Sequence, residues 1–197
     1  MKIRAVDISF GYGKKEEVLS HFNFEIQSGE IIGLMGKSGI GKTTLAKILA
    51  GYENPKSGRI LYEEMNIQKG KPHPVQLIFQ HPEKAVNPKW KMEKMLNESG
   101  VNYKPLLKPL GIEPAWLNRW PNELSGGELQ RFCVLRALHQ DTKFIIADEI
   151  TAMLDAVTQL DIWRFLIDYA QKHHMGIIAI SHDEILMKQI SHRVITF

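Results

Sequence analysis

The chain has 197 residues, of which 44% are apolar and 24% are charged, and its formal net charge is +3 at pH 7. This composition is ordinary for one globular domain with a substantial core, or for one domain with an inserted subdomain. The small excess of Lys and Arg lacks the clustered stripe of a nucleic-acid binder. The single cysteine, Cys133, excludes an intramolecular disulfide and a cysteine-rich metal site.

Cys133 lies in an apolar helical pattern, so we expect a buried, inert thiol and a reducing, cytosolic setting. No stretch approaches the roughly 20 apolar residues needed to cross a bilayer, and the first residues do not resemble a signal peptide. We therefore expect any membrane role to come through a partner protein.

The first part of the chain predicts short strands around one helix. Strands are expected at residues 3–10, 22–26 and 31–35, and a helix from about residue 42 to 50. A turn at 54–58 precedes a strand at 59–62, and the apolar run 75–79 is typical of a buried strand.

The texture changes between residues 82 and 121. Six prolines, at positions 82, 88, 105, 109, 114 and 121, predict short helical pieces, and the tryptophans at 90, 116 and 120 need a small core or an apolar patch to cover. We interpret this segment as a helical insertion.

The last part alternates helices with strands. Helices are expected at 125–138 and 156–171, strands at 144–147, 177–180 and 193–197, and a short helix before the last strand. Apolar runs that alternate with helices indicate a mainly parallel sheet covered on both faces.

Residues 36–43 read GKSGIGKT, a full match to the phosphate-loop pattern, between a predicted strand and a predicted helix. The glycines allow backbone N–H groups to converge on phosphate oxygens, Lys42 reaches the outer phosphates, and the Thr43 hydroxyl suits a magnesium shell. The alternative is a glycine-rich turn with a chance lysine. The predicted loop site comprises Gly36, Lys37, Ser38, Gly39, Ile40, Gly41, Lys42, Thr43 and Thr44.

A second candidate anion site begins at Ser125. Ser125, Gly126 and Gly127 stand at the start of a predicted helix, where backbone N–H groups are free to bind an anion. Because the chain already has a phosphate loop, this helix start is expected to serve the nucleotide of another copy across a two-fold axis. The alternative, a serine N-cap with glycines for tight packing, remains open on these residues alone.

The strand at 144–147 ends in two carboxylates, at the end of the strand where open α/β sheets bind ligands. Asp148 is placed to hold magnesium through water, and Glu149 to orient and deprotonate the water that attacks a terminal phosphate. Such a pair alone is often a surface turn, but here a phosphate loop lies upstream.

Six segments occur together: GKSGIGKT, VQLIFQ ending in Gln80, LSGGE, FIIADE, the loop 152–155 (AMLD), and ISHD containing His182. In this combination the chain resembles the ATP-binding cassette family, in its transporter ATPase form, along its whole length. The resemblance implies an α/β fold of the P-loop NTPase type, with a mainly parallel sheet core, an antiparallel β part and an inserted helical subdomain. We expect one nucleotide-binding domain over 1–197, with the core at about 1–81 and 143–197 and the helical subdomain at about 82–142.

The resemblance also implies roles for single residues. Gln80 is similar to the glutamine that senses magnesium and contacts the transmembrane partner, His182 to the switch histidine, and Tyr12 to the aromatic residue that stacks on adenine. The alternatives are a polar strand end, a helix-capping histidine and an ordinary loop tyrosine. The residues expected in catalysis are Lys42, Gln80, Glu149 and His182; magnesium is expected at Thr43, Gln80 and Asp148; and nucleotide is expected at the loop and at Tyr12, Ser125, Gly126, Gly127, Glu128 and Asp155.

By this resemblance the protein binds ATP and Mg²⁺ and pairs with a second ATPase subunit, identical or different. Ser125 and Gly127 of one chain would hold the terminal phosphate bound at Lys42 of the other. Further partners implied are transmembrane permease subunits and, indirectly, a substrate-binding protein, with no nucleic acid. The expected location is cytoplasmic, peripheral on the inner face of the cell membrane.

Within the family, FQHPEKAVNP resembles a segment of the oligopeptide, dipeptide and nickel importer ATPases, which implies uptake of peptides or of nickel and other metal chelates. His81 and Ile150 depart from that pattern, which has an acid and a proline there. The chain ends at Phe197, before the strand and helices with which members usually continue, so we expect no regulatory tail.

The competing class is a soluble cassette ATPase of DNA repair, translation or cofactor assembly. Repair types carry a long coiled-coil insertion and translation types carry two cassettes, and the sequence has neither. An assembly subunit without turnover is disfavoured because Glu149 is intact.

Overall fold

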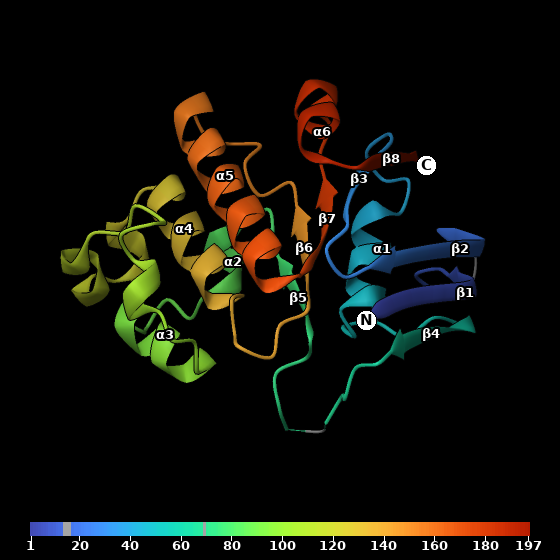
Figure 1. Cartoon of the computed structure of the whole chain (residues 1–197), viewed down its shortest axis with the longest axis horizontal. Helices are drawn as coiled ribbons and strands as arrows, with labels where there is room; N and C mark the ends of the chain where they lie inside the picture. Colours follow the sequence, from blue (N-terminus) through green and yellow to red (C-terminus); the bar gives the residue numbers. More distant parts are fainter. Residues whose placement is uncertain (14–16, 69) are drawn as a thin grey trace.

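The computed structural model describes residues 1–13, 17–68 and 70–197 (Figure 1). The strands are β1 (Lys2–Phe10), β2 (Leu19–Gln27), β3 (Ile31–Met35), β4 (Ser57–Glu63), β5 (Val75–Ile78), β6 (Phe144–Asp148), β7 (Gly176–Ile180) and β8 (Arg193–Thr196). The α-helices are α1 (Lys42–Leu49), α2 (Pro82–Ala85), α3 (Met92–Ser99), α4 (Gly126–Arg136), α5 (Ala156–His173) and α6 (Glu184–Ile190), and three short 3₁₀ helices are η1 (Lys104–Leu106), η2 (Pro114–Asn118) and η3 (Pro121–Glu123).

The strands form two sheets. One is antiparallel, in the order β2-β1-β4, and the other has five strands in the order β5-β6-β7-β3-β8, with every neighbouring pair parallel. The predicted α/β fold, with a parallel core sheet and an antiparallel part, is confirmed. Because all five strands run the same way, their carboxyl ends meet at one edge, where ligands bind in open α/β sheets.

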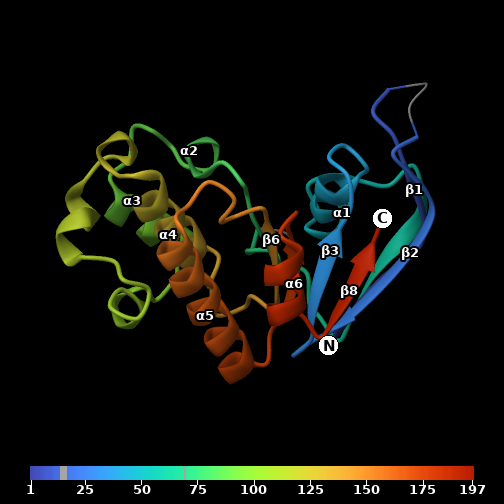
Figure 2. The same ribbon diagram turned by 90° about the horizontal axis from the view of Figure 1, so that it is seen from above.

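The parallel sheet is covered on both faces (Figures 1 and 2). All residues of β6 and β7 are buried, which explains their continuous apolar runs. One apolar cluster joins Ile145 and Ile177 to helices α3, α4 and α5, and a second joins Ile146 and Ile178 to α1 and the antiparallel sheet. Successive residues of a strand point to opposite faces of the sheet, so β6 and β7 each contribute side chains to both clusters.

Between β5 and β6 the chain forms the short helices expected from its prolines. Apolar residues of the short helix α3, such as Met92 and Leu96, join the same cluster as one face of the parallel sheet. Trp116 is partly buried against this cluster, whereas Trp120 is exposed. Cys133 is buried as expected, and burial raises the pKa of its thiol to about 12. The limits of a separate helical subdomain, at 82 and 142, stay a prediction.

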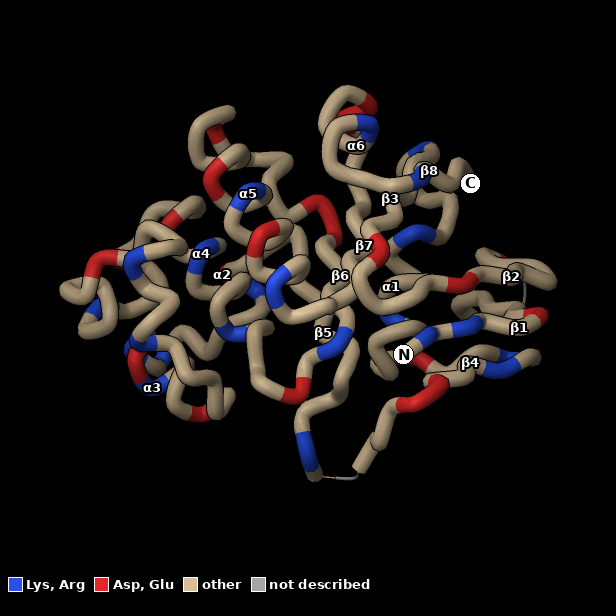
Figure 3. The backbone as a smooth tube through the Cα atoms, in the orientation of Figure 1, with Lys and Arg blue, Asp and Glu red and all other residues tan. Residues whose placement is uncertain are grey.

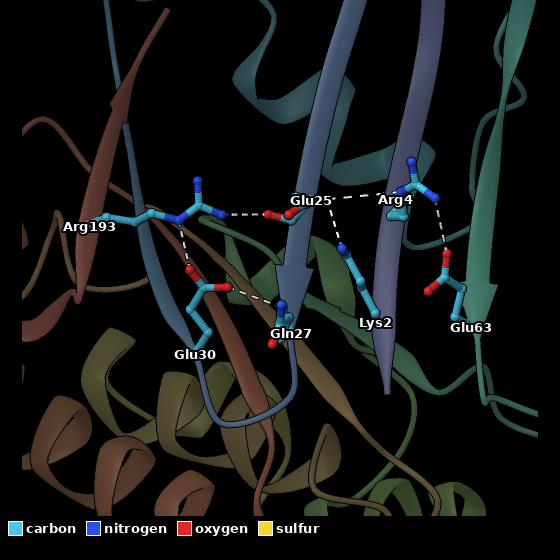
Figure 4. Close-up of polar contacts among 7 residues, drawn as sticks. All are labelled: Lys2, Arg4, Glu25, Gln27, Glu30, Glu63 and Arg193. Carbon is cyan, nitrogen blue, oxygen red and sulfur yellow. Dashed lines mark hydrogen bonds and ion pairs between the residues drawn. The ribbon is translucent and has the colours of Figure 1, made fainter.

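Charged side chains connect the two sheets near the start of β3 (Figure 4). Arg193 of β8 donates from Nε to Glu30 Oε1 over 2.7 Å and from Nη2 to the Glu25 carbonyl of β2 over 2.7 Å. Lys2 of β1 pairs with the Glu25 carboxylate at 2.8 Å. These exposed pairs contribute little stability each, but they link the edge strand β8 to the antiparallel sheet.

Positively and negatively charged residues are interspersed along the described backbone (Figure 3). Among the described residues, no helix combines the length and the apolar character that crossing a bilayer requires.

Candidate functional site

The loop at 36–41 connects the buried strand β3 to helix α1. Gly36, Gly39 and Gly41 have φ values of 146°, 80° and 117°, in the region that favours glycine. A Cβ at Gly41 would lie 3.1 Å from side-chain and backbone atoms of Val18, so close packing also disfavours a larger residue at this position. The outer loop residues Lys37, Ser38, Gly39 and Ile40 are exposed. The loop is thus shaped by its glycines and open to a ligand.

Lys42 lies under this loop rather than in solvent. Its side chain is part of the buried set, at 5% exposure, and Nζ donates to the carbonyls of Gly36 at 2.8 Å and Lys37 at 3.0 Å. A lysine of chance occurrence on a surface turn would extend into water, since burial of an ammonium needs partners. The ammonium is held where the loop backbone converges.

Thr43, the next residue, connects α1 to the end of β6. Thr43 Oγ1 donates a hydrogen bond to Asp148 Oδ2 over 2.8 Å. Burial raises the pKa of Asp148, and the Thr43 hydrogen bond opposes that rise. A buried carboxylate beside a hydroxyl is a pair of hard oxygen ligands, and a cation there would relieve the cost of burying the negative charge.

Glu149 lies between two partners from other strands. Its Oε2 accepts from Gln80 Nε2 at 3.0 Å, and its Oε1 lies 2.6 Å from His182 Nε2. Glu149 also has φ 51°, a left-handed conformation that costs a non-glycine residue roughly 1–3 kcal/mol and persists only where the surroundings require it. Gln80 follows β5 and His182 follows β7, so both flank the end of β6.

Tyr12 lies in the loop after β1. The residue is 51% exposed, its ring packs edge-on against Phe10 with centroids 5.1 Å apart, and its hydroxyl lies 3.3 Å from Thr44 Oγ1. The exposed ring is therefore held near the start of α1, within reach of the phosphate-loop helix.

The helix start at Ser125 has the geometry of a capping box. Ser125 Oγ accepts from the Glu128 N–H at 3.3 Å, and Glu128 Oε2 accepts from the Ser125 N–H at 2.8 Å. The glycine after Gly126 also packs closely, because a Cβ at Gly127 would lie 3.2 Å from Thr158 Cγ2. In the single chain, Ser125 is therefore an N-cap followed by a closely packed glycine, as in the alternative interpretation. The anion-binding role of these residues stays a prediction.

Asp155 is the N-cap of α5. Its carboxylate accepts from the N–H groups of Val157 at 3.1 Å and Thr158 at 3.0 Å, and these hydrogen bonds, with that from the Thr158 hydroxyl, hold its pKa below the usual range. A pocket of about 400 Å³ lies between this loop and the helix start. Its lining includes Ser125, Gly126, Gly127, Glu128 and Asp155.

The predicted residues therefore fall into two groups. Lys42, Thr43 and Asp148 lie next to the group of Gln80, Glu149 and His182, at the carboxyl edge of the parallel sheet. Ser125 and Asp155 line the other pocket. No hydrogen bond or ion pair within 1–13, 17–68 and 70–197 joins the two groups.

Some residues beside the phosphate loop were not predicted. A pocket of about 630 Å³ is lined by Gly36, Lys37 and His182 together with Glu184, Lys188, Val194 and Thr196. Val194 and Thr196 come from β8, which pairs with β3, and Glu184 and Lys188 come from α6, which contacts β3. The only sequence signal for them is that the last apolar run follows the strand pattern of the sheet.

Comparison with known proteins agrees with this geometry. The family model described as ABC transporter matches residues 19–152. Curated relatives include the nickel import system ATP-binding protein NikE of two Staphylococcus aureus strains, bovine RF122 / ET3-1 and N315. The two proteins are 34% and 33% identical to this chain over 201 residues, and each match spans 95% of this chain and 83% of the relative.

Solved structures show the same fold. The cassette MJ0796, in a dimeric post-hydrolysis state bound to ADP and Pi, has a TM-score of 0.84 at 23% identity. The match covers 99% of this chain and 94% of the MJ0796 chain. The cbiO1 protein of Clostridium perfringens, part of the ABC transporter complex cbiONQ, has a TM-score of 0.81 at 24% identity, covering 98% and 83%. The chain therefore belongs to the ABC transporter family, and it is an ATPase with the P-loop cassette fold of that family.

Proposed function

We propose that the protein is the ATP-binding and ATP-hydrolysing subunit of an importer. The observation that carries this proposal is the position of Glu149, whose carboxylate lies between Gln80 and His182 beside the Thr43–Asp148 hydrogen bond. A carboxylate held at both oxygens, at the carboxyl end of a parallel strand and next to a phosphate loop, suits a base for an attacking water.

ATP would bind with its phosphates on the loop and its base on Tyr12. The N–H groups of residues 36–44 would face the phosphates, and Lys42 would exchange the carbonyls of Gly36 and Lys37 for phosphate oxygens. The exposed Tyr12 ring offers a surface for adenine.

Thr43, Gln80 and Asp148 fit a magnesium ion, because all three can present oxygen atoms and two of them already meet at 2.8 Å. When bound, Mg²⁺ would neutralise negative charge on the phosphates. Glu149 would accept a proton from the attacking water, while Gln80 and His182 hold its carboxylate in orientation.

The second group of residues would act on a neighbouring subunit. In a pair of subunits, Ser125, Gly127 and Glu128 of one chain would close over the nucleotide bound at Lys42 of the other, with Asp155 beside them. This assignment gives a use to the pocket that contains Ser125 and Asp155, which has no contact with the phosphate loop of its own chain. The partner subunit is either a second copy or a related ATPase.

The family supports the transport role, and the names of the relatives support a class of cargo. Permease subunits in a membrane would couple to the ATPase from the cytoplasmic side, supplied by a substrate-binding protein. The curated relatives NikE are named for nickel import. Together with the segment FQHPEKAVNP, this supports uptake of nickel, other metal chelates or peptides.

The catalytic assignment is tested with Glu149→Gln and a matched control, Glu63→Gln, on the edge strand β4. We expect Glu149→Gln to bind ATP with near-wild-type affinity and to lose at least a hundredfold in turnover, whereas Glu63→Gln keeps both. Wild-type turnover by Glu149→Gln would remove Glu149 from its role.

The transport assignment is tested by purifying the tagged chain from detergent-solubilised cells and identifying what accompanies it. Recovery of integral membrane permease subunits supports an importer, and recovery of ribosomes or DNA contradicts it. Uptake of radioactive nickel and of labelled peptides, compared in cells with and without the gene, then distinguishes the cargoes.

A further inference from the structure

A buried hydrogen bond joins helix α5 to the loop that follows Glu149. Trp163 Nε1 donates to Thr151 Oγ1 over 3.1 Å, and the two residues are only 2% and 5% exposed. Thr151 lies two positions after Glu149, and Trp163 lies in the second turn of α5. The bond therefore joins the loop 149–155 to the helix that follows it.

The loop needs such support because Glu149 has an unfavourable backbone conformation. Its φ of 51° is maintained by a hydrogen bond from the Glu149 N–H to the Ile180 carbonyl at 3.0 Å and by one from the Ala152 N–H to the Glu149 carbonyl at 3.1 Å. Both bonds act on the first part of the loop. The Leu154 N–H donates to the Thr151 carbonyl at 3.2 Å, so Thr151 is where the turn after Glu149 meets the turn before α5.

The Trp163 side chain that contacts Thr151 is itself held by the core. Its ring belongs to the same apolar cluster as Ile145 of β6 and Ile177 of β7. Side chains in a close-packed core have little freedom to move, so the indole N–H presents a fixed donor to the loop. Without this donor the Thr151 hydroxyl would be a buried polar group lacking its partner, which favours a different loop conformation.

We propose that Trp163, through the Thr151 hydroxyl, is a positioning residue that orients Glu149 for hydrolysis. Neither residue touches the reacting atoms. The inference rests on the proposed catalytic role of Glu149. Among the described residues, the indole N–H of Trp163 makes no hydrogen bond other than the one to Thr151.

The test compares substitutions at two buried threonines, Thr151 and Thr142. Thr151→Val removes the acceptor and keeps the shape, and Thr151→Ser keeps the acceptor. The matched control is Thr142→Val: Thr142 is 3% exposed, its hydroxyl donates to the Ala137 carbonyl at 2.9 Å, and it lies before β6 rather than after it. Trp163→Phe removes the donor and gives a second route if Thr151→Val does not fold.

For the full chain we expect Thr151→Val to lower kcat at least tenfold with KM for ATP within twofold of wild type. Thr151→Ser should stay within threefold of wild-type kcat, and Thr142→Val within twofold, although both valine variants lower Tm. The double variant Thr151→Val with Trp163→Phe should lose no more than the larger single loss, because both changes break one bond.

A readout independent of turnover is hydrogen exchange of the Trp163 indole proton, followed by NMR. Exchange should accelerate in Thr151→Val and not in Thr142→Val. The proposal is overturned if Thr151→Val and Trp163→Phe both keep wild-type kcat, or if Thr142→Val loses as much as Thr151→Val. If Glu149→Gln itself keeps turnover, the proposed function fails instead.

Discussion

His182 Nε2 lies 2.6 Å from Glu149 Oε1, in a contact made possible by the order of the strands. Glu149 follows β6, His182 follows β7 closely, and these parallel neighbours pair with Asp148 beside Ile180. Because the strands are in this register, a carboxylate and an imidazole from separate segments meet at the carboxyl edge of the sheet.

The contact between His182 and Glu149 predicts a specific kinetic effect. His182→Ala should lower kcat for ATP hydrolysis by about a hundredfold, the lower range for loss of a group that assists proton transfer, with little change in KM. Steady-state ATPase assays check this. The control is His173→Ala, an exposed histidine at the end of α5, which should keep wild-type kcat. An increase in KM at unchanged kcat would mean that His182 binds substrate instead.

Lys42 predicts a loss of affinity rather than of turnover alone. Hydrogen bonds to charged groups contribute about 1.5–3 kcal/mol, so Lys42→Ala should weaken ATP binding roughly ten- to a hundredfold. Isothermal titration calorimetry measures the change, and the rise of Tm with ATP should shrink accordingly. Lys47→Ala, in the last turn of the same helix, serves as control. Unchanged ATP affinity in Lys42→Ala would contradict the phosphate-loop assignment.

Tyr12 separates stacking from hydrogen bonding. Base stacking on an aromatic ring is worth roughly 1–3 kcal/mol, so Tyr12→Ala should weaken ATP binding by about five- to a hundredfold. Tyr12→Phe keeps the ring and loses only the contact with Thr44, so its ATP affinity should stay within about twofold of wild type. Equal effects of the two substitutions would show that the hydroxyl, not the ring, is what matters.

Asp148 predicts a conflict between stability and function. Its pKa is raised in the folded protein, chiefly by burial, so folding favours the protonated form and stability falls as the pH rises through the folded pKa. Asp148→Asn keeps an acceptor for Thr43 without the charge. We expect a higher Tm than wild type by a few degrees at pH 7.5, equivalent to about 1 kcal/mol, and a smaller difference at acidic pH.

The effect of magnesium on Tm tests the function of the Asp148 carboxylate. Mg²⁺ with ATP should raise the Tm of the wild type and have a much smaller effect on Asp148→Asn, because the variant lacks the carboxylate. Differential scanning calorimetry at several pH values measures both effects. A lower Tm for Asp148→Asn than for wild type at pH 7.5 would contradict the burial argument.

Ser125 allows its two possible roles to be told apart. As an N-cap, Ser125→Ala should cost roughly 1 kcal/mol of stability, whereas Ser125→Asp should keep the cap. As a phosphate ligand for a second subunit, both substitutions should abolish ATP-dependent dimerisation of the Glu149→Gln background, the aspartate because its charge opposes the phosphate. Light scattering with saturating ATP checks this, with thermal unfolding as the stability readout. Dimerisation retained in Ser125→Asp would leave only the capping role.

Local residue patterns were enough to predict the elements and the motifs, because each depends on residues close together in the chain. Alternating patterns and continuous apolar runs predicted the eight strands, and period-3.6 patterns predicted the helices α1, α4 and α5, close to their observed bounds. Proline spacing predicted short helices between β5 and β6. The loop at 36–43 was recognisable because glycine, lysine and threonine must stand at fixed positions to surround a phosphate.

Which groups meet was implied by the family resemblance but not by local spacing, because the contacts join segments far apart in the chain. Thr43 and Asp148 are 105 positions apart, and their contact depends on the order β5-β6-β7-β3-β8, which no local pattern encodes. The same order brings Gln80 and His182 to opposite sides of Glu149, and packing of α5 brings Trp163 to Thr151. Local chemistry is written in residue spacing, whereas proximity across strands is a property of how the whole sheet assembles.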